Sequence, residues 1–236
     1  MATDAFPSSR AETLYQRLTQ RFRLVRVSHQ VGGEQVDLYK AENIDQLLNE
    51  LIALDDDHIS ITDERLPYWA DLWPAAIGLS EYLLRASWLE PGMQVLEIGC
   101  GMGLCGIIAG RAGAAVMMTD YLSEAIELAE LNALTNRVEA SYQLMDWRHP
   151  DPALQADVLL ASEVPYENRA FQPLFQAFNT LVRPGGRVLL GEPRRNIAKP
   201  FLQALPGYGF FVEKSEAPVR LQDREIMTDV YEIRMG

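Results

Sequence analysis

The sequence has few cysteines, few histidines and no long apolar run. With only Cys100 and Cys105 in 236 residues, a disulfide framework is excluded, and without a second Cys or His pair a metal site is disfavoured. No apolar stretch approaches the roughly 20 residues of a membrane-spanning helix. The N-terminus lacks the basic start and apolar core of a secretory signal. These features predict a protein of a reducing, cytoplasmic compartment, with no metal ion and no membrane partner.

The sequence is also poor in positive charge. Its 21 Lys and Arg stand against 33 Asp and Glu, which gives a formal net charge of −12. A surface of this sign repels phosphate groups, so nucleic acids and anionic membranes are disfavoured as partners. The basic group formed by Arg194, Arg195 and Lys199 is most simply interpreted as a solvated loop. At 48% hydrophobic, the chain has ordinary globular composition, and its length favours one domain with an N-terminal addition.

The first part of the chain is expected to form helices and a hairpin. Residues 11–21 and 44–54 have helical spacing. Two alternating stretches, 22–30 and 34–42, are joined by Val-Gly-Gly and predict a β-hairpin. An acidic loop follows, and Pro74 fits the first turn of a helix that runs to about Arg85. We assign residues 1–66 to an accessory region, a candidate lid, and residues 67–236 to the main domain.

From residue 93 onward, short apolar strands alternate with helices. The expected strands are 93–99, 114–120, 138–146, 156–162, 187–193, 209–219 and 224–235. The expected helices are 103–113, 123–134 (with Ser123 as N-cap), 171–182 and 197–206. This order predicts an α/β fold with a Rossmann-like seven-stranded sheet, mostly parallel, and helices on both faces. The last two strands have no helix between them, so we expect an antiparallel C-terminal hairpin at one edge.

A glycine-rich turn at residues 95–106, VLEIGCGMGLCG, lies between a strand and a helix. This arrangement is typical of an anion or nucleotide site. No Lys–Ser/Thr pair follows, so a P-loop is excluded. Gly101, Gly103 and Gly106 match GxGxxG, the dinucleotide fingerprint. Counted from Gly99, however, that fingerprint requires its third glycine at the position of Leu104, so the match is out of register.

The acidic residue before the glycines favours a different ligand. The pattern Glu97-x-Gly99-x-Gly101-x-Gly103, with Cys100 inside it, is typical of a site for S-adenosylmethionine (SAM). SAM carries an ammonium and a sulfonium group, for which a carboxylate is a favourable neighbour. The same carboxylate would repel a pyrophosphate. The loop therefore predicts a SAM site in preference to a dinucleotide site.

The next two strand ends carry further candidates for the same ligand. Asp120 can accept hydrogen bonds from both ribose hydroxyls, much as in dinucleotide sites, and Tyr121 follows it directly. Asp146 can accept from the adenine amino group, and the indole of Trp147 can cover the ring. Chance acidic loop residues in an acidic protein are the alternative interpretation, above all for Asp146 or Trp147 taken singly.

With these residues, the chain resembles class I SAM-dependent methyltransferases. Within them it resembles the seven-strand protein N-methyltransferases often called methyltransferase family 16. The stretches that carry the resemblance are YWADLWPAAIGLSEYLL, VMMTDYLSEAIELAELNALTN, the Asp-Trp pair at 146–147, ADVLLASEVPYE and VLLGEPRR. The last is similar to the lysine methyltransferase that acts on the electron-transfer flavoprotein β subunit. The likeness covers residues 66–200 well and the ends weakly.

The resemblance implies SAM as the cofactor, S-adenosylhomocysteine (SAH) as its product, and Trp73 and Ser162 in the cofactor pocket. It also places an acidic-x-x-Tyr motif at Glu163 and Tyr166. We hypothesise that Glu163 orients the acceptor amine and that Tyr166 shapes its channel, with a structural strand-end role for Glu163 as the alternative. The sequence departs from the family in having Glu163 where Asp is more frequent, and in Pro165.

The acceptor class remains open at this point. A cationic protein segment, with lysine as the methylated residue, is the leading expectation. A small, nicotinamide-like amine is the alternative, and a non-catalytic SAM-binding protein or an NAD(P)-binding protein is a third possibility. For the aromatic pair before the first strand, we expect Trp69 in the core. Glu192 is expected either to contact substrate or to lie at the surface.

Overall fold

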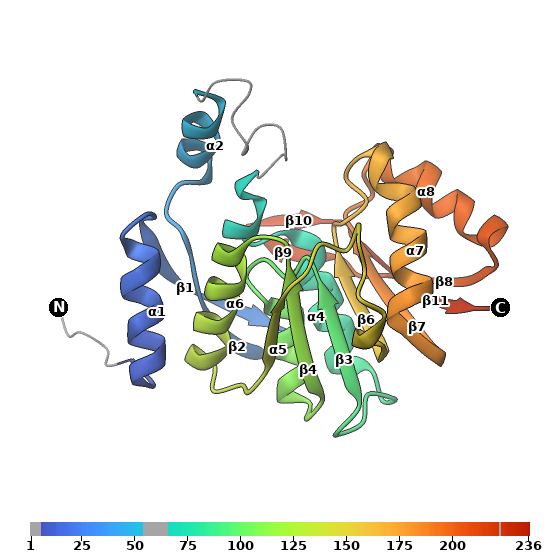
Figure 1. Ribbon diagram of the computed structural model, residues 1–236, viewed down its shortest axis with the longest axis horizontal. Coiled ribbons are helices and arrows are strands. Elements are labelled where there is room, and N and C mark those ends of the chain that lie inside the picture. Colours follow the sequence, from blue (N-terminus) through green and yellow to red (C-terminus); the bar gives the residue numbers. More distant parts are fainter. Residues whose placement is uncertain (1–5, 54–65, 222) are drawn as a thin grey trace.

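The computed structural model describes residues 6–53, 66–221 and 223–236, and the acidic loop expected from residue 55 lies mostly outside them. The predicted seven-stranded sheet is confirmed, with strand order β5-β4-β3-β6-β7-β11-β8 (Figure 1). Its five neighbouring parallel strands are β3 (Gln94–Ile98), β4 (Ala115–Asp120), β5 (Ser141–Leu144), β6 (Ala156–Ser162) and β7 (Val182–Glu192). The chain builds β4 and β5 on one side of β3, and then β6 and β7 on the other.

The two strands at the C-terminal end pair as predicted. β11 (Asp229–Met235) runs antiparallel to both β7 and β8 (Phe210–Glu216) and lies between them. Between β8 and β11 the chain also makes a short hairpin, β9 (Val219–Leu221) with β10 (Arg224–Ile226), which the sequence analysis missed.

Arg194 links these strands. It lies two residues after β7, and its guanidinium lies 2.7 Å from Asp229 on β11 and 2.6 Å from Glu216 on β8. Arg194 is an exposed loop residue, as expected, and its charge also has two carboxylate partners.

Helices cover both faces of the sheet (Figure 1). α4 (Pro74–Arg85), α5 (Leu104–Arg111) and α6 (Ser123–Thr135) pack on one face, and α7 (Phe171–Leu181) and α8 (Lys199–Ala204) on the other. Alternate strand residues supply the two cores: Val95 lies in one hydrophobic cluster and Leu96 in the other. The 3-10 turns are η1 (Pro67–Ala70), η2 (Pro152–Leu154), η3 (Asn168–Ala170), η4 (Asn196–Ala198) and η5 (Leu205–Tyr208).

One predicted helix start is correct and one is wrong. Pro74 is the first residue of α4, which ends at Arg85 as expected. Ser123 is not the N-cap of α6, because the helix already includes it and its hydroxyl donates to the Glu124 carboxylate. Leu122 is the capping residue, and its N–H donates to the side chain of Asp120, 3.1 Å away. α6 thus begins without the expected side-chain cap, and Asp120 fixes the residue that precedes the helix.

The N-terminal elements are α1 (Ser9–Thr19), β1 (Leu24–Val31), β2 (Glu34–Ala41) and α2 (Ile44–Ile52). The predicted hairpin is confirmed, with Gly32 and Gly33 at positive φ in its turn. Both α1 and β2 pack on α6. In the described residues, no helix combines the length and apolar character needed to cross a bilayer.

Candidate cofactor and active site

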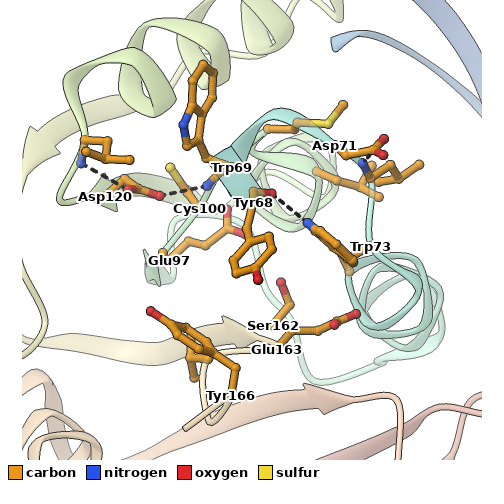
Figure 2. A pocket seen from close by; sticks show the side chains of 18 of the residues that line it. Tyr68, Trp69, Asp71, Trp73, Glu97, Cys100, Asp120, Ser162, Glu163 and Tyr166 are labelled. Atoms are coloured by element: carbon orange, nitrogen blue, oxygen red, sulfur yellow. Dashed lines mark hydrogen bonds between the residues drawn. The ribbon is translucent and has the colours of Figure 1, made fainter. Parts of the chain in front are cut away.

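A cavity of about 400 Å³ opens at the carboxyl ends of β3, β4 and β6. It lies where the chain switches from one side of the sheet to the other, the usual ligand position in such folds, and its volume is in the range of roughly 300–1,000 Å³ typical of ligand pockets. The predicted site residues in its wall, several of them drawn in Figure 2, are Trp73, Glu97, Gly99, Cys100, Gly101, Asp120, Tyr121, Trp147, Ser162, Glu163 and Tyr166. Gly103 and Asp146 are not in its wall.

The glycine loop has a conformation that only glycine adopts easily. Gly99 and Gly101 have φ values of +60° and +50°, in the left-handed region. A Cβ atom on Gly101 would also lie 3.3 Å from the backbone oxygen of Trp69. The loop backbone is thus tightly packed on one side and faces the cavity on the other.

Gly103 and Gly106 serve packing behind the loop. A Cβ on Gly103 would lie 3.0 Å from the sulfur of Met118 and 3.1 Å from the Cβ of Ala129. A Cβ on Gly106 would lie 2.5 Å from the terminal methyl of Met118. Both glycines let α5 approach β4, so Gly103 serves packing as Gly106 does, and its contact with a ligand stays a prediction.

Glu97 is buried, with 2% of its surface exposed. Its Oε2 atom accepts a hydrogen bond of 2.9 Å from the N–H of Gly106 in the first turn of α5. Burial, the largest cause, raises the pKa of Glu97 to about 8, although the hydrogen bond from Gly106 opposes this rise. The group is therefore mostly protonated near neutral pH, and a positive charge placed in the cavity would favour its ionised form.

Asp120 fixes the loop from the end of β4. One of its oxygens accepts from the N–H of Gly101 and the other from the N–H of Leu122, each at 3.1 Å. Burial raises the pKa of Asp120 to about 6, against the effect of backbone donors at Gly101, Leu122 and Tyr121. A carboxylate has about four acceptor positions, so these donors leave capacity for a ligand hydroxyl.

Asp146 and Trp147 are neighbours in the sequence, but only Trp147 belongs to the cavity wall. Trp147 lies in the cavity wall next to Gly99. The Asp146 carboxylate instead accepts from the backbone N–H and the side chain of Arg148, at 2.8 Å in each case. Asp146 itself is not among the residues of the cavity wall, and its contact with a ligand stays a prediction. Tyr121 remains in the wall.

Glu163 follows β6 in an unusual conformation. Its φ of +58° is in the left-handed region, which non-glycine residues seldom adopt and which often marks a functional site. Its Oε1 accepts a hydrogen bond of 3.0 Å from the N–H of Ala75 in the first turn of α4. Arg195 lies 3.7 Å from Oε2 and donates to the Glu163 carbonyl at 3.1 Å. Burial raises the pKa of Glu163, while the Ala75 N–H and Arg195 oppose that rise.

Three aromatic side chains, Tyr68, Trp73 and Tyr166, lie beside Glu163, and we call them the aromatic mouth (Figure 2). The ring centroids of Tyr68 and Tyr166 are 6.4 Å apart, and those of Tyr68 and Trp73 are 5.7 Å apart. Trp73 donates from Nε1 to the Tyr68 carbonyl at 2.6 Å. Tyr68 and Tyr166 are 42% and 38% exposed, so the mouth is open to solvent. Burial raises the pKa of the Tyr166 phenol to about 12, which keeps it protonated.

The two tryptophans do not share a helix face. Trp69 belongs to η1 and Trp73 precedes α4, with a break in the helical structure between them. Trp69 is largely buried and packs edge to face on Phe22, with 5.2 Å between ring centroids, so its predicted core position is correct.

Among the polar residues of the cavity wall, sequence reasoning missed three: Tyr68, Asp71 and Arg195. Tyr68 and Asp71 lie in the same sequence stretch as Trp73, but no sequence pattern in that stretch indicated them as site residues. Arg195 was assigned to a solvated loop. It ion-pairs instead with Glu192, which is fully buried and lies neither at the surface nor in the cavity wall.

Comparisons with known proteins agree with this architecture. A family model described as lysine methyltransferase matches residues 39–207. Histidine protein methyltransferase 1 homolog of Dictyostelium discoideum is 28% identical over 172 residues, covering 70% of this chain and 53% of that protein. Electron transfer flavoprotein beta subunit lysine methyltransferase of Danio rerio is 28% identical over 131 residues, covering 55% of this chain and 51% of that protein. The chain thus spans about half the length of these relatives.

A solved structure shares the fold. Magnesium protoporphyrin IX methyltransferase from Synechocystis PCC 6803, determined with bound SAM, superposes with a TM-score of 0.56 at 15% identity. The match covers 82% of this chain and 92% of that one. At this identity the likeness concerns the fold.

Proposed function

The chain belongs to the lysine methyltransferase family, and from this premise we propose that it is a SAM-dependent N-methyltransferase acting on a lysine of a protein. The observation that carries the proposal is a single cavity whose wall includes both the glycine loop with Asp120 and the pair Glu163 and Tyr166. The first group fits a nucleoside with a cationic tail, and the second fits an amine.

The residues of the cavity fit SAM by their chemistry. Glu97 can stabilise a cationic methionine end, and the backbone of Gly99, Cys100 and Gly101 permits close approach. Asp120 can accept from the ribose hydroxyls with the acceptor capacity that its backbone donors leave free. The aromatic rings that can flank the adenine are Tyr121 and Trp147, with Trp73 and Ser162 completing the wall. When bound, SAM supplies a methyl group on a positively charged sulfur, and SAH is the product.

The protein's own task is to present a neutral amine. A lysine ammonium must lose a proton before its nitrogen lone pair can form the new N–C bond. In this proposal Glu163 accepts a hydrogen bond from the amine and orients it, since α4 and Arg195 hold the carboxylate in place. Tyr166, with Tyr68, lines the approach, and aromatic faces attract an alkylammonium group.

Two features support a protein segment as the acceptor. The aromatic mouth is open to solvent, which suits a side chain carried on a larger molecule. The net charge of −12 favours the approach of a cationic segment. Cys100 and Cys105 are free, buried thiols, the state maintained in a reducing compartment, so we place the reaction in the cytoplasm.

Labelling of a cell lysate tests the proposal. The lysate is incubated with SAM carrying a radioactive methyl group and with the purified protein, and proteins and small molecules are then separated. We expect a labelled protein band, with the label on lysine after hydrolysis. Label confined to the small-molecule fraction would favour the small-amine alternative. Calorimetric binding of NADH without binding of SAM would overturn the cofactor assignment.

The variant Glu163→Gln tests the role of the Glu163 carboxylate in this proposal. We expect transfer to fall by about 100-fold, the effect that misplacement of a reacting group can have, while SAH affinity stays unchanged. Full activity of this variant with an unaltered pH profile would remove Glu163 from the mechanism.

A further inference from the structure

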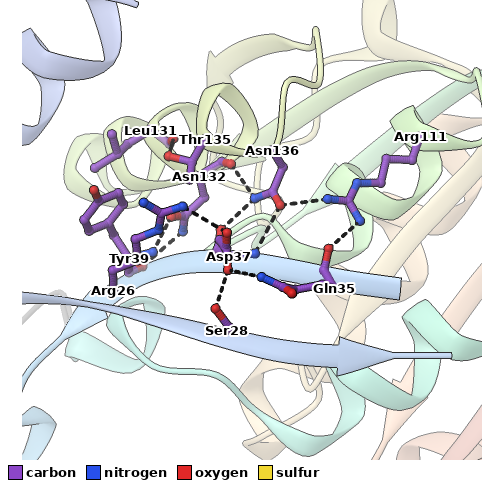
Figure 3. A network of polar contacts seen from close by, with 10 residues as sticks. All are labelled: Arg26, Ser28, Gln35, Asp37, Tyr39, Arg111, Leu131, Asn132, Thr135 and Asn136. Carbon is purple, nitrogen blue, oxygen red and sulfur yellow. Dashed lines mark hydrogen bonds and ion pairs between the residues drawn. The ribbon is translucent and has the colours of Figure 1, made fainter. Parts of the chain in front are cut away.

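Asn132 on α6 connects two parts of the molecule that are distant in sequence. The residue is fully buried. Its Oδ1 accepts from the N–H of Tyr39 on β2 at 2.7 Å, and its Nδ2 donates to the Tyr39 carbonyl at 3.1 Å (Figure 3). The same Nδ2 donates to the carbonyl of Met102 at 3.0 Å. One side-chain amide thus joins the N-terminal hairpin to the glycine loop.

Asn136, one turn further along α6, repeats the contact with β2 (Figure 3). It accepts from the N–H of Asp37 at 3.1 Å and donates to the Asp37 carbonyl at 2.7 Å. Four helix residues rise about 6.0 Å, close to the roughly 6.8 Å between alternate residues of a strand. The two amides therefore take the place of peptide groups of a neighbouring strand along this edge of β2, whose other edge pairs with β1.

The two asparagines differ in their remaining contacts. Asn136 donates also to the carbonyl of Asn132, within α6, and accepts from Arg111 on α5. Asn132 alone of this pair contacts the glycine loop, through Met102. That residue lies between Gly101 and Gly103, is 4% exposed and belongs to the cavity wall.

A second contact ties the hairpin to the same cavity. Lys40, which follows Tyr39 on β2, forms an ion pair and hydrogen bond with Asp71 in the cavity wall. The Lys40 and Asp71 side chains are only 18% and 25% exposed. The hairpin is thus fixed to the cavity at two points, in an arrangement that suits a rigid support better than a lid that opens.

We infer that Asn132 is a positioning residue that braces the glycine loop against the N-terminal hairpin and thereby raises the affinity for SAM. The inference rests on the proposed function, because it takes this cavity as the SAM site. The physical basis is preorganisation: fixing the Met102 carbonyl holds the two flanking glycines in their left-handed conformations before the ligand arrives. Without the brace, the loop would have to be ordered during binding, which weakens affinity.

The test compares SAH binding to the full-length wild type, Asn132→Ala and Asn136→Ala by calorimetry. Both variants lose the amide that clamps β2, so both should speed hydrogen exchange at the Tyr39 and Asp37 amides. Only Asn132→Ala should raise the dissociation constant of SAH strongly, by about fivefold to tenfold, the effect of one lost hydrogen bond. Asn136→Ala should change it less than twofold. Asn132→Asp keeps the shape and the acceptor for the Tyr39 N–H but loses the donor to the Tyr39 and Met102 carbonyls, so its SAH affinity should fall as in Asn132→Ala.

The outcomes separate this inference from the proposed function. If the wild type binds SAH and the two alanine variants weaken binding equally, or neither does, the brace is refuted while the SAM site stands. If the wild type binds neither SAH nor SAM, the proposed function is refuted, and the brace inference is refuted too because it depends on that function.

Discussion

Acidic side chains occupy two regions of this molecule under opposite conditions. Along α6, Glu124, Glu127 and Glu130 are partly exposed, and each is paired with an arginine of the N-terminal segment: Arg21, Arg17 and Arg10, respectively. At the strand ends, Glu97, Asp120 and Glu163 are buried or nearly so and accept hydrogen bonds mainly from backbone N–H groups. The first set forms a seam between two parts of the chain, and the second lines the cavity.

The comparison of these two regions shows that the net charge of a protein does not indicate which of its carboxylates have a function. In the seam, solvent screens each ion pair, so the contribution to stability is small. In the cavity, burial raises the pKa of all three carboxylates, so their ionisation depends on what else the cavity holds. Replacing acidic residues in the two regions should therefore produce effects of very different size and kind.

The largest effect is expected at Asp120. Asp120→Ala removes the acceptor of the Gly101 and Leu122 N–H groups together with the acceptor capacity proposed for the ribose hydroxyls. We expect the dissociation constant of SAH to rise about 100-fold, because two charge-assisted hydrogen bonds contribute about 3 kcal/mol. Calorimetry measures this effect, and Asp120→Asn, which keeps the shape, should give an intermediate loss. Unchanged binding by the alanine variant would place the ribose elsewhere.

An intermediate effect is expected at Glu97, as a change in the pH dependence of stability. The ordinary pKa of a glutamate is 4.5 and that of Glu97 in the folded protein is about 8, so the folded protein binds this proton more tightly than the unfolded chain. The resulting stabilisation is fully present below pH 4.5 and is lost as the pH rises toward 8. Urea unfolding should show stability falling by about 1 kcal/mol per pH unit within this window.

Glu97→Gln provides the control for that measurement. The variant cannot ionise, so this part of the pH dependence should disappear, while the slope from other groups remains. An identical slope in wild type and variant between pH 5 and 8 would mean that Glu97 is ionised in the folded protein.

The smallest effect is expected in the seam. Arg17 and Glu127 lie 2.6 Å apart, and their side chains are 55% and 21% exposed. Glu127→Gln should lower the free energy of unfolding by less than about 1 kcal/mol, and by less still at high salt. SAH affinity should not change. A loss of SAH affinity in Glu127→Gln would contradict the separation of the two regions and show that the seam also supports the cavity.

The sheet and the glycine loop could be predicted because their signals are local. Alternation of apolar strands with helices fixes the fold class, and the spacing of Glu97, Gly99 and Gly101 marks the turn. The positions of individual carboxylates depend on partners that no local pattern indicates. Asp146 forms an ion pair with Arg148, and Glu163 is held by Arg195, 32 residues away. The short β9–β10 hairpin was not predicted, because strands of three residues each are too short to show an alternating pattern.

The place of β11 in the sheet has a consequence for the order of assembly during synthesis. β8 is made before β11, yet among the described strands its neighbour in the sheet is β11 alone. When β8 leaves the ribosome it therefore has no strand to join, and β7 is the edge until β11 arrives. Arg194 cannot bind Asp229 before that moment. This edge can therefore close only after β11 has been made, either by β11 joining β7 first or by β8 and β11 docking on β7 as a formed hairpin.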